Sequence, residues 1–583
     1  MKSNVVIWSK VSAFPCAPRT DQSSINVGTE LVTFSNHADL RLVGFHDYPI
    51  GRPENGRWML VLPGFGETKT DVLGEAYFLA KNGFNTLRFD YSYHIGESDG
   101  DITNTTLEAL KNDILSCLDF VCRKFVPVKV GAVASSLASR ALLRAGREDR
   151  RLRLLLNLVS IVDLQKTLFS IYQEDYLESI KEGKPVGIMD VLGFQIDAGE
   201  FLRSAIENSY ENLQTTIDDV RHTEAPVVFF AAENDAWVQL DDVRQVIYAI
   251  PGKRSDLYIL DGAMHELQEN PAVSRRALNG VIASAVQYLT DPSDNHPIVQ
   301  PRLREIGFRI RKEKLRNKII YETKKEDERD FWKSYLDKYS FVVNVPDYWE
   351  LMTLVYSLLR LGDQHGEESV LDAGCGIGNF GAYLLVKRLY AAKKDPLNMP
   401  DYSCHYVGLD FVEEAVLQAR QTHHLLEQEF LGLSSVCPQR TLLNGRYVLA
   451  DLEFWPPFRK GTFEKICCNL VISYLRNPLE SMISLAALLK SGGRLVVSSL
   501  KPFADLSQVY RNFIKMAKHK TEIEEARKLL SNAGRIKAKE AHGVYEFFSE
   551  TALTDLMRSA GLLEVETYRS LGNQANIVVG LKN

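Results

Sequence analysis

Long apolar runs are missing from this sequence, in which no stretch approaches the ~18–20 unbroken apolar residues that a bilayer span requires. The apolar run at residues 154–162 is short and fits a buried strand. The first 18 residues also lack a basic segment leading into an apolar one, so no secretory signal is expected. We therefore expect a cytoplasmic protein without integral membrane contact.

An excess of basic residues is absent as well. The 69 Lys and Arg residues against 75 Asp and Glu residues give a net charge of −6 at pH 7. Nucleic-acid-binding domains usually carry a basic patch, so DNA and RNA are not expected as partners. The eight cysteines are scattered without a C-x-x-C pair, and no metal site is expected.

The length of 583 residues exceeds what one hydrophobic core supports, since cores stop growing at roughly 250–300 residues. Prolines at 292, 297 and 301 among polar residues are typical of a domain boundary. We predict one domain at 1–290, a linker with a basic helical segment at 291–345, and a second domain at 346–583. The basic stretch 302–325 fits either a solvated amphipathic helix or a docking face for an acidic carrier protein.

The first half alternates short apolar runs with amphipathic stretches, the rhythm of βαβ units in an α/β protein with a mostly parallel sheet. Strands are predicted at 58–62, 85–89, 128–134, 154–162, 226–231 and 257–260. The third strand continues directly into Ser135 and Ser136 and then a helical pattern. A nucleophile elbow requires this strand–turn–helix context, with small residues two positions either side of the serine. Ala134 and Ala138 meet that requirement for Ser136, which is the predicted nucleophile.

Two backbone N–H groups are candidates for an oxyanion hole beside Ser136. Leu137 N–H stands at the start of the following helix, whose N-terminus favours negative charge. The turn after the first predicted strand offers Phe65 N–H as the second donor. In this fold the three catalytic residues follow one another along the chain in the order serine, acid, histidine, each after a strand. This order assigns His265 as the base that takes the proton from Ser136, and Asp235 as the acid that orients the imidazole and stabilises its cation.

These residues resemble the acyl-transfer thioesterases of bacterial bioluminescence operons, which release myristate from its carrier. The resemblance spans about residues 33–290. It rests on residues 64–65, 82–96, 134–137 and 234–238 and on His265. It implies an α/β-hydrolase fold and a fatty-acyl thioester as substrate, with an acyl-carrier protein as the expected partner.

A second α/β rhythm begins near residue 348, with strands predicted at 369–371, 406–409, 447–449, 465–469, 493–498 and 576–580. The first of these strands leads into a D-x-G-x-G-x-G loop at residues 372–378, where glycines let the backbone approach a ligand closely. Asp410 ends the next strand and suits ribose hydroxyls, while Asp451 and Leu452 follow the third and suit adenine.

Gly376, Gly378 and Gly381 also satisfy the dinucleotide pattern G-x-G-x-x-G. Asp372 before the glycines and the distance to Asp410 oppose that alternative.

Residues 489–495 resemble the L-K-P-G-G segment of class I methyltransferases, and the resemblance covers about residues 348–583. It implies a Rossmann-like domain that uses S-adenosylmethionine. The implied cofactor residues are Asp372, Gly374, Gly376, Gly378, Asp410, Phe411, Asp451, Leu452 and Asn469. Gly374, Gly376 and Gly378 would line the methionine end, and Phe411 could stack on adenine. An N-P-P-Y-type tetrapeptide is absent at Asn469, which argues against methylation of DNA bases. His542 and Tyr474 are the only guesses for a general base.

The sequence therefore predicts a bifunctional enzyme: acyl transfer or hydrolysis at Ser136, and methylation of a small molecule at a carboxyl or hydroxyl group. The alternative is that one domain has become a non-catalytic module that binds a carrier protein or substrate for the other. Acyl length, the methyl acceptor and the oligomeric state do not follow from the sequence.

Overall fold

The structure is a computed structural model that describes residues 5–8, 25–50, 56–252, 255–291, 298–302, 328–337, 345–361, 366–394, 402–432, 443–454, 456–541 and 543–583. The chain forms two compact units, residues 1–316 and 317–583. The basic stretch 302–325 lies outside the described residues except for Arg302, and His542 lies outside them too. The domain limits taken from the sequence stay a prediction.

The first unit is built on a nine-stranded sheet in the order β1-β11-β10-β7-β6-β4-β5-β3-β2. The strands are β1 Val5–Trp8, β2 Asn26–Ser35, β3 Arg41–Ile50, β4 Arg57–Leu62, β5 Asn85–Phe89, β6 Lys129–Ser135, β7 Leu152–Leu158, β10 Val227–Ala232 and β11 Ser255–Leu260. All neighbours from β1 to β5 are parallel, whereas β3 and β2 are antiparallel. All six predicted strands are present, although β7 ends at Leu158 and not at residue 162, and the sheet also contains β1 and the antiparallel pair β2–β3.

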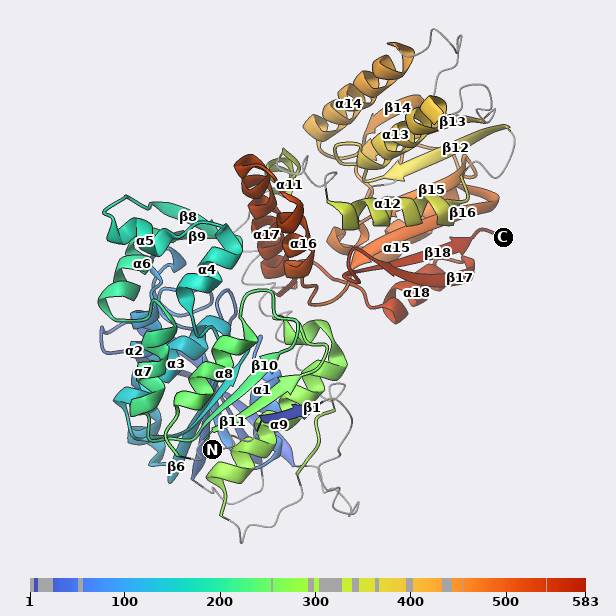
Figure 1. The fold of residues 1–583 in the computed structure, drawn as a ribbon. Helices are drawn as coiled ribbons and strands as arrows, with labels where there is room; N and C mark the ends of the chain where they lie inside the picture. Colours follow the sequence, from blue (N-terminus) through green and yellow to red (C-terminus); the bar gives the residue numbers. More distant parts are fainter. Residues whose placement is uncertain are drawn as a thin grey trace. The chain divides into compact units, whose positions relative to one another are not determined.

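Helices cover both faces of this sheet (Figure 1). They are α1 Leu73–Lys81, α2 Leu107–Phe125, α3 Ser136–Glu148, α7 Leu213–His222, α8 Leu240–Ala249 and α9 Pro271–Leu289. Apolar side chains of α1 and α9, such as Ala76 and Val281, pack on Met59 and Leu156 from the sheet. Helices α2 and α3 contact each other, and α3 also packs on β6 and β7. Burial of the sheet on both faces explains why its central strands read as continuous apolar runs.

An insertion between β7 and α7 forms a small separate layer (Figure 1). It comprises α4 Leu164–Tyr172, α5 Tyr176–Lys181, β8 Ile188–Val191, β9 Phe194–Asp197 and α6 Ala198–Glu207. Its β8–β9 hairpin brings the Phe194 ring to 5.8 Å from the Phe65 ring. The insertion therefore covers the loop that follows β4.

The second unit holds a seven-stranded sheet in the order β14-β13-β12-β15-β16-β18-β17. The strands are β12 Gly366–Ala373, β13 Tyr402–Asp410, β14 Asn444–Leu449, β15 Phe463–Asn469, β16 Leu489–Leu500, β17 Leu563–Ser570 and β18 Ala575–Leu581. Strand β18 pairs antiparallel with both β16 and β17, and the other neighbours are parallel. The chain runs outward from β12 to β14 and returns to β15 on the other side of β12. Open parallel sheets bind ligands at such a reversal, beyond the carboxyl ends of the strands.

Helices also flank both faces of the second sheet. They are α12 Pro346–Leu359, α13 Asn379–Lys394, α14 Glu413–Gly432, α15 Pro478–Leu488 and α18 Glu550–Ser559. Apolar residues of α15 and α18, including Leu485 and Leu553, pack on Ile466 and Val497. The unit also contains α11 Glu328–Asp337, α16 Ser507–Met516 and α17 Lys520–Ala541. The predicted fold class, two α/β domains of hydrolase-like and Rossmann-like type, is confirmed.

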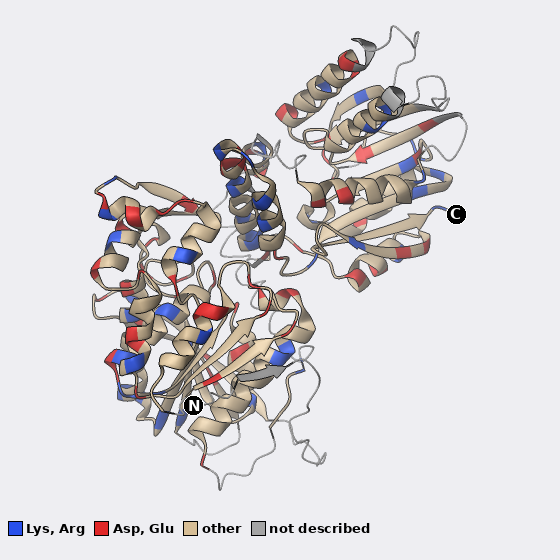
Figure 2. Cartoon of the chain, viewed as in Figure 1, with Lys and Arg blue, Asp and Glu red and all other residues tan. Residues whose placement is uncertain are grey.

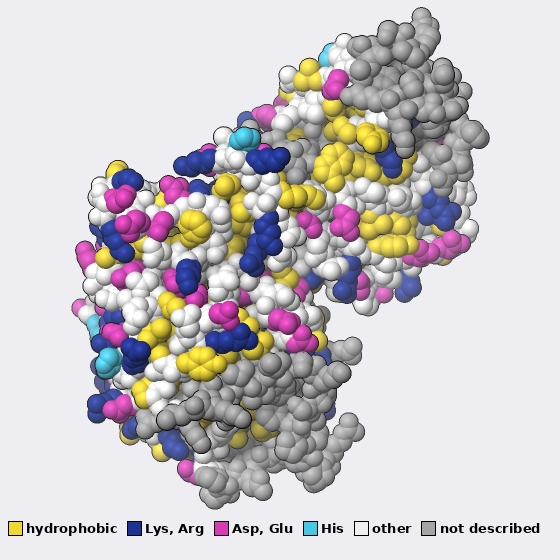
Figure 3. Space-filling model, viewed as in Figure 1, with side chains coloured by type: hydrophobic (Ala, Val, Ile, Leu, Met, Phe, Trp, Pro, Cys, Tyr) yellow, Lys and Arg dark blue, Asp and Glu magenta, His cyan; other side chains and the backbone are white. Residues whose placement is uncertain are grey.

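Lys and Arg residues are interspersed with Asp and Glu residues along the elements of both units (Figure 2). On the face shown in Figure 3, hydrophobic side chains lie among polar and charged ones. Among the helices that the structure describes, none is long and apolar enough to cross a bilayer.

Candidate active sites

Ser136 stands at a strained turn between β6 and α3. Its φ is +50°, a left-handed conformation that costs energy for any residue except glycine. Ala134 and Ala138, two positions either side, are 1% and 0% exposed. Positions 134 and 138 are therefore packed too tightly for residues larger than alanine. The strained backbone at Ser136 is typical of a nucleophile elbow, in which the serine hydroxyl is raised above the edge of the sheet.

The ends of three parallel strands bring Ser136, His265 and Asp235 together. The Oγ atom of Ser136 lies 2.9 Å from Nε2 of His265. Nδ1 of the same ring lies 2.8 Å from Oδ2 of Asp235. Oδ1 of Asp235 accepts hydrogen bonds from the backbone N–H groups of Trp237 at 2.8 Å and Val238 at 3.0 Å. These bonds fix the buried carboxylate, so the three predicted side chains form a continuous hydrogen-bonded relay.

The loop after β4 is held by hydrogen bonds on both sides of Phe65. Gly64 N–H donates to Oε2 of Glu67 at 2.6 Å, and Gly66 N–H donates to Nε2 of His94 at 3.2 Å. Glu67 Oε2 also accepts from the Ser135 hydroxyl at 3.3 Å. Leu137 lies in the first turn of α3, where backbone N–H groups have no partner within the helix. The geometry suits Phe65 and Leu137 as oxyanion donors, a role that stays a prediction.

The second unit contains a cavity of about 790 Å³ at the reversal between β12 and β15. This volume lies in the ~300–1,000 Å³ range of small-molecule sites. Eight of the nine predicted cofactor residues line it, namely Asp372, Gly374, Gly376, Asp410, Phe411, Asp451, Leu452 and Asn469. Gly378 does not line it, because it packs on Ala419 and His423 instead, and its carbonyl accepts from His423 Nε2 at 2.7 Å. Gly378 therefore supports the glycine-rich loop by packing against α14 and does not face the cavity.

The acidic residues of the cavity are partly held by the protein itself. Asp410 accepts from Gly376 N–H at 2.8 Å through Oδ2 and from Val412 N–H at 3.0 Å through Oδ1. Each carboxylate oxygen keeps a lone pair for a further donor. Burial raises the pKa of Asp410, and a ligand hydroxyl that hydrogen-bonds to the carboxylate would offset that cost.

Asn469 carries the clearest sign of an intended ligand. Its Nδ2 and Oδ1 atoms are both buried, and neither has a hydrogen-bond partner among the described residues. Leaving a buried amide unsatisfied is costly, so such groups in native proteins call for an explanation. Because Asn469 lines the cavity at the end of β15, a polar ligand group there would satisfy both atoms.

Residues 51–320 match the sequence model of the family described as acyl transferase. An acyl transferase of Vibrio campbellii is 30% identical over 234 residues, which are 40% of this chain and 76% of that relative. Another, from Shewanella hanedai, is 29% identical over 263 residues, which are 45% of this chain and 84% of that relative. The chain belongs to the acyl transferase family.

A second family model, described as methyltransferase domain, matches residues 348–567. This acyl transferase is therefore a bifunctional enzyme, in which a methyltransferase domain follows the acyl transferase domain. Both resemblances inferred from the sequence are confirmed. A solved esterase domain from a Rhodothermus marinus protein aligns with 46% of this chain and 100% of its own length, at 20% identity and a TM-score of 0.35.

His94 is a part of the acyl transferase site that sequence reasoning did not single out. Burial lowers the pKa of His94 to about 4, so its ring is neutral at neutral pH and can accept the Gly66 N–H bond. We predict that His94→Leu lowers kcat roughly tenfold, because Gly66 N–H is then left unpaired and the Phe65 loop shifts. His94→Gln, whose amide oxygen can replace the ring nitrogen, should stay within a few-fold of wild type. The measurement is kcat in an acyl-thioester cleavage assay. Equal losses of kcat in His94→Leu and His94→Gln would contradict this positioning role.

Helix α11 was also missed, because the sequence assigned its residues to the linker. Leu336 and Trp332 pack beside Ile377 and Phe411 of the cavity. Glu328 at the start of α11 bonds to Lys539 Nζ at 2.8 Å and to the Tyr545 hydroxyl at 2.8 Å. Helix α11 is thereby held over the glycine-rich loop. Its aromatic residues at helical spacing were the signal that could have identified it.

The pH dependence of ligand binding to the methyltransferase domain should follow Asp372. Burial raises its pKa to about 6, although the Tyr406 hydroxyl donates to it at 2.7 Å. Between pH 5 and 7 the carboxyl therefore changes from mostly neutral to mostly ionised, and the ionised form attracts a cationic ligand. We expect calorimetric S-adenosylmethionine affinity to rise several-fold over this range. Asp372→Asn should reduce the rise, because Asp410, whose pKa is also raised, still titrates in the cavity, and an undiminished rise in the variant would contradict the assignment.

Proposed function

We propose that the acyl transferase domain transfers an acyl group from a thioester to Ser136 and then to water or another nucleophile. His265 Nε2 takes the proton of the Ser136 hydroxyl as Oγ attacks the thioester carbonyl, and Asp235 stabilises the imidazolium. The oxyanion of the tetrahedral intermediate accepts from Phe65 and Leu137 N–H. As the carbon–sulfur bond breaks, the imidazolium proton goes to the departing thiolate. The observation that carries this proposal is the 2.9 Å and 2.8 Å relay ending at a strained serine.

The second half of the cycle regenerates the serine. His265, neutral again, removes a proton from the incoming nucleophile as it attacks the acyl ester, and then returns that proton to Ser136 Oγ. The expected donor is a fatty-acyl or polyketide-like thioester on an acyl-carrier protein, in keeping with the family resemblance. We propose the cytoplasm as the compartment.

For the methyltransferase domain we propose S-adenosylmethionine as the methyl donor. The cavity residues fit it: Gly374 lines the cavity at a φ of +77°, where a Cβ would also lie 2.6 Å from Val471, so the loop requires glycine there, and Asn469 presents an unsatisfied amide. Asp410 would hold the ribose, Asp451 and Leu452 the adenine, and Gly374 and Gly376 the methionine end. When bound, the cofactor supplies an electrophilic methyl group. The protein's part is to hold an acceptor carboxyl or hydroxyl group in line with it.

The experiment that tests both halves supplies acyl-carrier protein loaded with a labelled acyl chain together with S-adenosylmethionine carrying a labelled methyl group. The proposal expects an acyl adduct on the peptide that contains Ser136, followed by a released product. A product carrying both labels would show that the two sites act on one intermediate. Acyl release without any adduct on Ser136 would refute the assigned mechanism.

A further inference from the structure

We propose that the methyl acceptor is a molecule with a straight aliphatic chain, and that this chain binds at the end of the cavity opposite the nucleoside residues. The inference rests on the proposed methyl transfer and names the substrate class of the same site. It follows from how differently the two ends of the cavity are built.

The charged residues that line the cavity lie away from one end. Asp372 and Asp410 lie at the ends of β12 and β13, and Asp451 and Glu453 follow β14. The other charged residues are Glu328 and Arg329 of α11 and Arg476, which lies beyond β15. The other end is mostly aliphatic, and its lining residues are Val345, Tyr348, Met352, Leu500, Leu506, Val509 and Leu571. They come from the start of α12, the end of β16, the start of α16 and the turn between β17 and β18.

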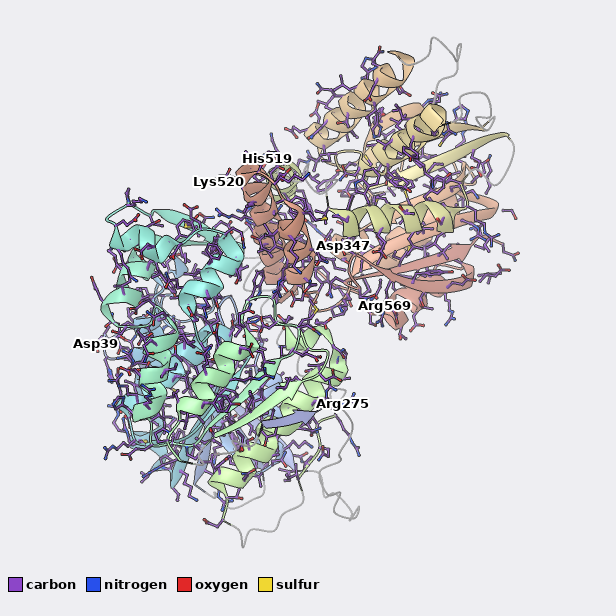
Figure 4. All side chains as sticks on the ribbon, in the orientation of Figure 1. Asp39, Arg275, Asp347, His519, Lys520 and Arg569 are labelled. Atoms are coloured by element: carbon purple, nitrogen blue, oxygen red, sulfur yellow. The ribbon has the colours of Figure 1, made fainter. Side chains whose placement is uncertain are left out.

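These elements meet at one place, and we call it the aliphatic compartment. A Cβ built on Gly572, in the β17–β18 turn, would lie 3.2 Å from Val509 and 3.4 Å from Asp347 Oδ1. Asp347, labelled in Figure 4, marks the first turn of α12. Val345, Met352 and Val509 are each 2% exposed, so the walls are fixed by packing.

An aliphatic chain suits this compartment, because all of its lining side chains except that of Tyr348 are aliphatic. Three other aromatic residues of the cavity, Trp332, Tyr474 and Tyr545, pack on one another, with Trp332 and Tyr474 ring centroids 4.6 Å apart and Tyr474 and Tyr545 centroids 4.9 Å apart. Each methylene removed from water tightens binding roughly fourfold. The affinity of a linear ligand should therefore rise steeply with chain length until the compartment is full.

The polar end of such a ligand has a defined neighbour. Asn469 lies where the strand end faces the cavity, with a donor and an acceptor that lack partners among the described residues. A hydroxyl or carboxyl group at the head of the chain can satisfy one of these two atoms and the proposed cofactor the other, which would place that head near the glycine-rich loop. A chain with a polar head is also the class of product that we propose for the acyl transferase domain, so that domain would supply the acceptor.

The test is photolabelling of the full-length protein with a straight-chain fatty acid that carries a diazirine on its chain, in the presence of S-adenosylhomocysteine. Peptide mapping separates adducts in the two domains. We expect adducts on the peptides that contain Leu506, Val509 or Leu571. Unlabelled linear acids should compete more strongly as their chains lengthen.

Leu506→Asp is the main variant, because Leu506 is half-buried and precedes α16 at the N-cap, where aspartate is favourable. It should reduce labelling of the compartment more than tenfold. Val509→Phe should shift competition toward shorter chains. Leu563→Asp, on a side chain 51% exposed, is the matched control and should label as wild type does.

S-adenosylmethionine titration of the same samples separates the two possible failures. Wild type that binds the cofactor but takes no label in the compartment would overturn the aliphatic acceptor and leave the proposed function standing. Labelling that Leu506→Asp and Leu563→Asp lower equally would overturn it as well. Wild type that fails to bind the cofactor would overturn both.

Discussion

Replacing Ser136 with alanine should lower kcat for thiol release from an acyl-coenzyme A thioester by at least about 10⁴-fold, as loss of the serine does in other relays of this type. The expected loss is large because Oγ is the atom that would bond to the acyl carbon, 2.9 Å from its base. His265→Ala should cost nearly as much, and the double variant should cost little more than either alone. Such non-additivity is the signature of groups that act as one unit.

Ser135→Ala is the matched control for this prediction. Ser135 is the preceding residue, and its hydroxyl donates to Glu67 instead of His265. It should retain most of the activity. Comparable loss in Ser135→Ala, or substantial activity left in Ser136→Ala, would contradict the assignment. Inactive wild type with a folded site would instead support a non-catalytic module.

Asp410→Ala should weaken S-adenosylmethionine binding by at least about 100-fold, since two hydrogen bonds to a charged group are worth about 1.5–3 kcal/mol each. The side chain also holds Gly376 N–H at 2.8 Å, so its loss loosens the glycine-rich loop. Titration calorimetry measures the effect directly. The acyl transferase activity of the same protein should stay unchanged.

Glu480→Ala removes an exposed acidic residue of the same domain and is the control for charge. It should bind the cofactor as wild type does. If Asp410→Ala also bound normally, the ribose would not lie at this strand end, and the orientation proposed for the cofactor would be wrong.

The sequence predicted the positions of Ser136, Asp235 and His265 because each follows a short apolar strand. Strand periodicity is local, and parallel strands bring their carboxyl ends to one edge, so residues far apart in the chain could be placed together. The same logic placed Asp372, Asp410 and Asn469 around one cavity. These assignments depend on the strand order, which short connections and chain topology largely determine.

The features that the sequence did not show depend on tertiary contacts. His94 accepts a hydrogen bond from the backbone of Gly66, 28 residues earlier in the chain. Glu67 accepts one from the hydroxyl of Ser135, 68 residues later. Helix α11 is short and polar on one side, and its place over the cavity is set by the partners of Glu328 on another helix and loop. The prediction that Gly378 lines the cavity was wrong. The spacing of the glycine motif does not show which of its glycines faces the ligand.

The most direct test of the central claim is mass spectrometry of the wild-type protein after reaction with an alkyl fluorophosphonate. We predict one covalent adduct on the peptide that contains Ser136, and none in His265→Ala, since the relay must activate the hydroxyl. An adduct on another serine, or no adduct on a folded wild-type protein, would contradict the account.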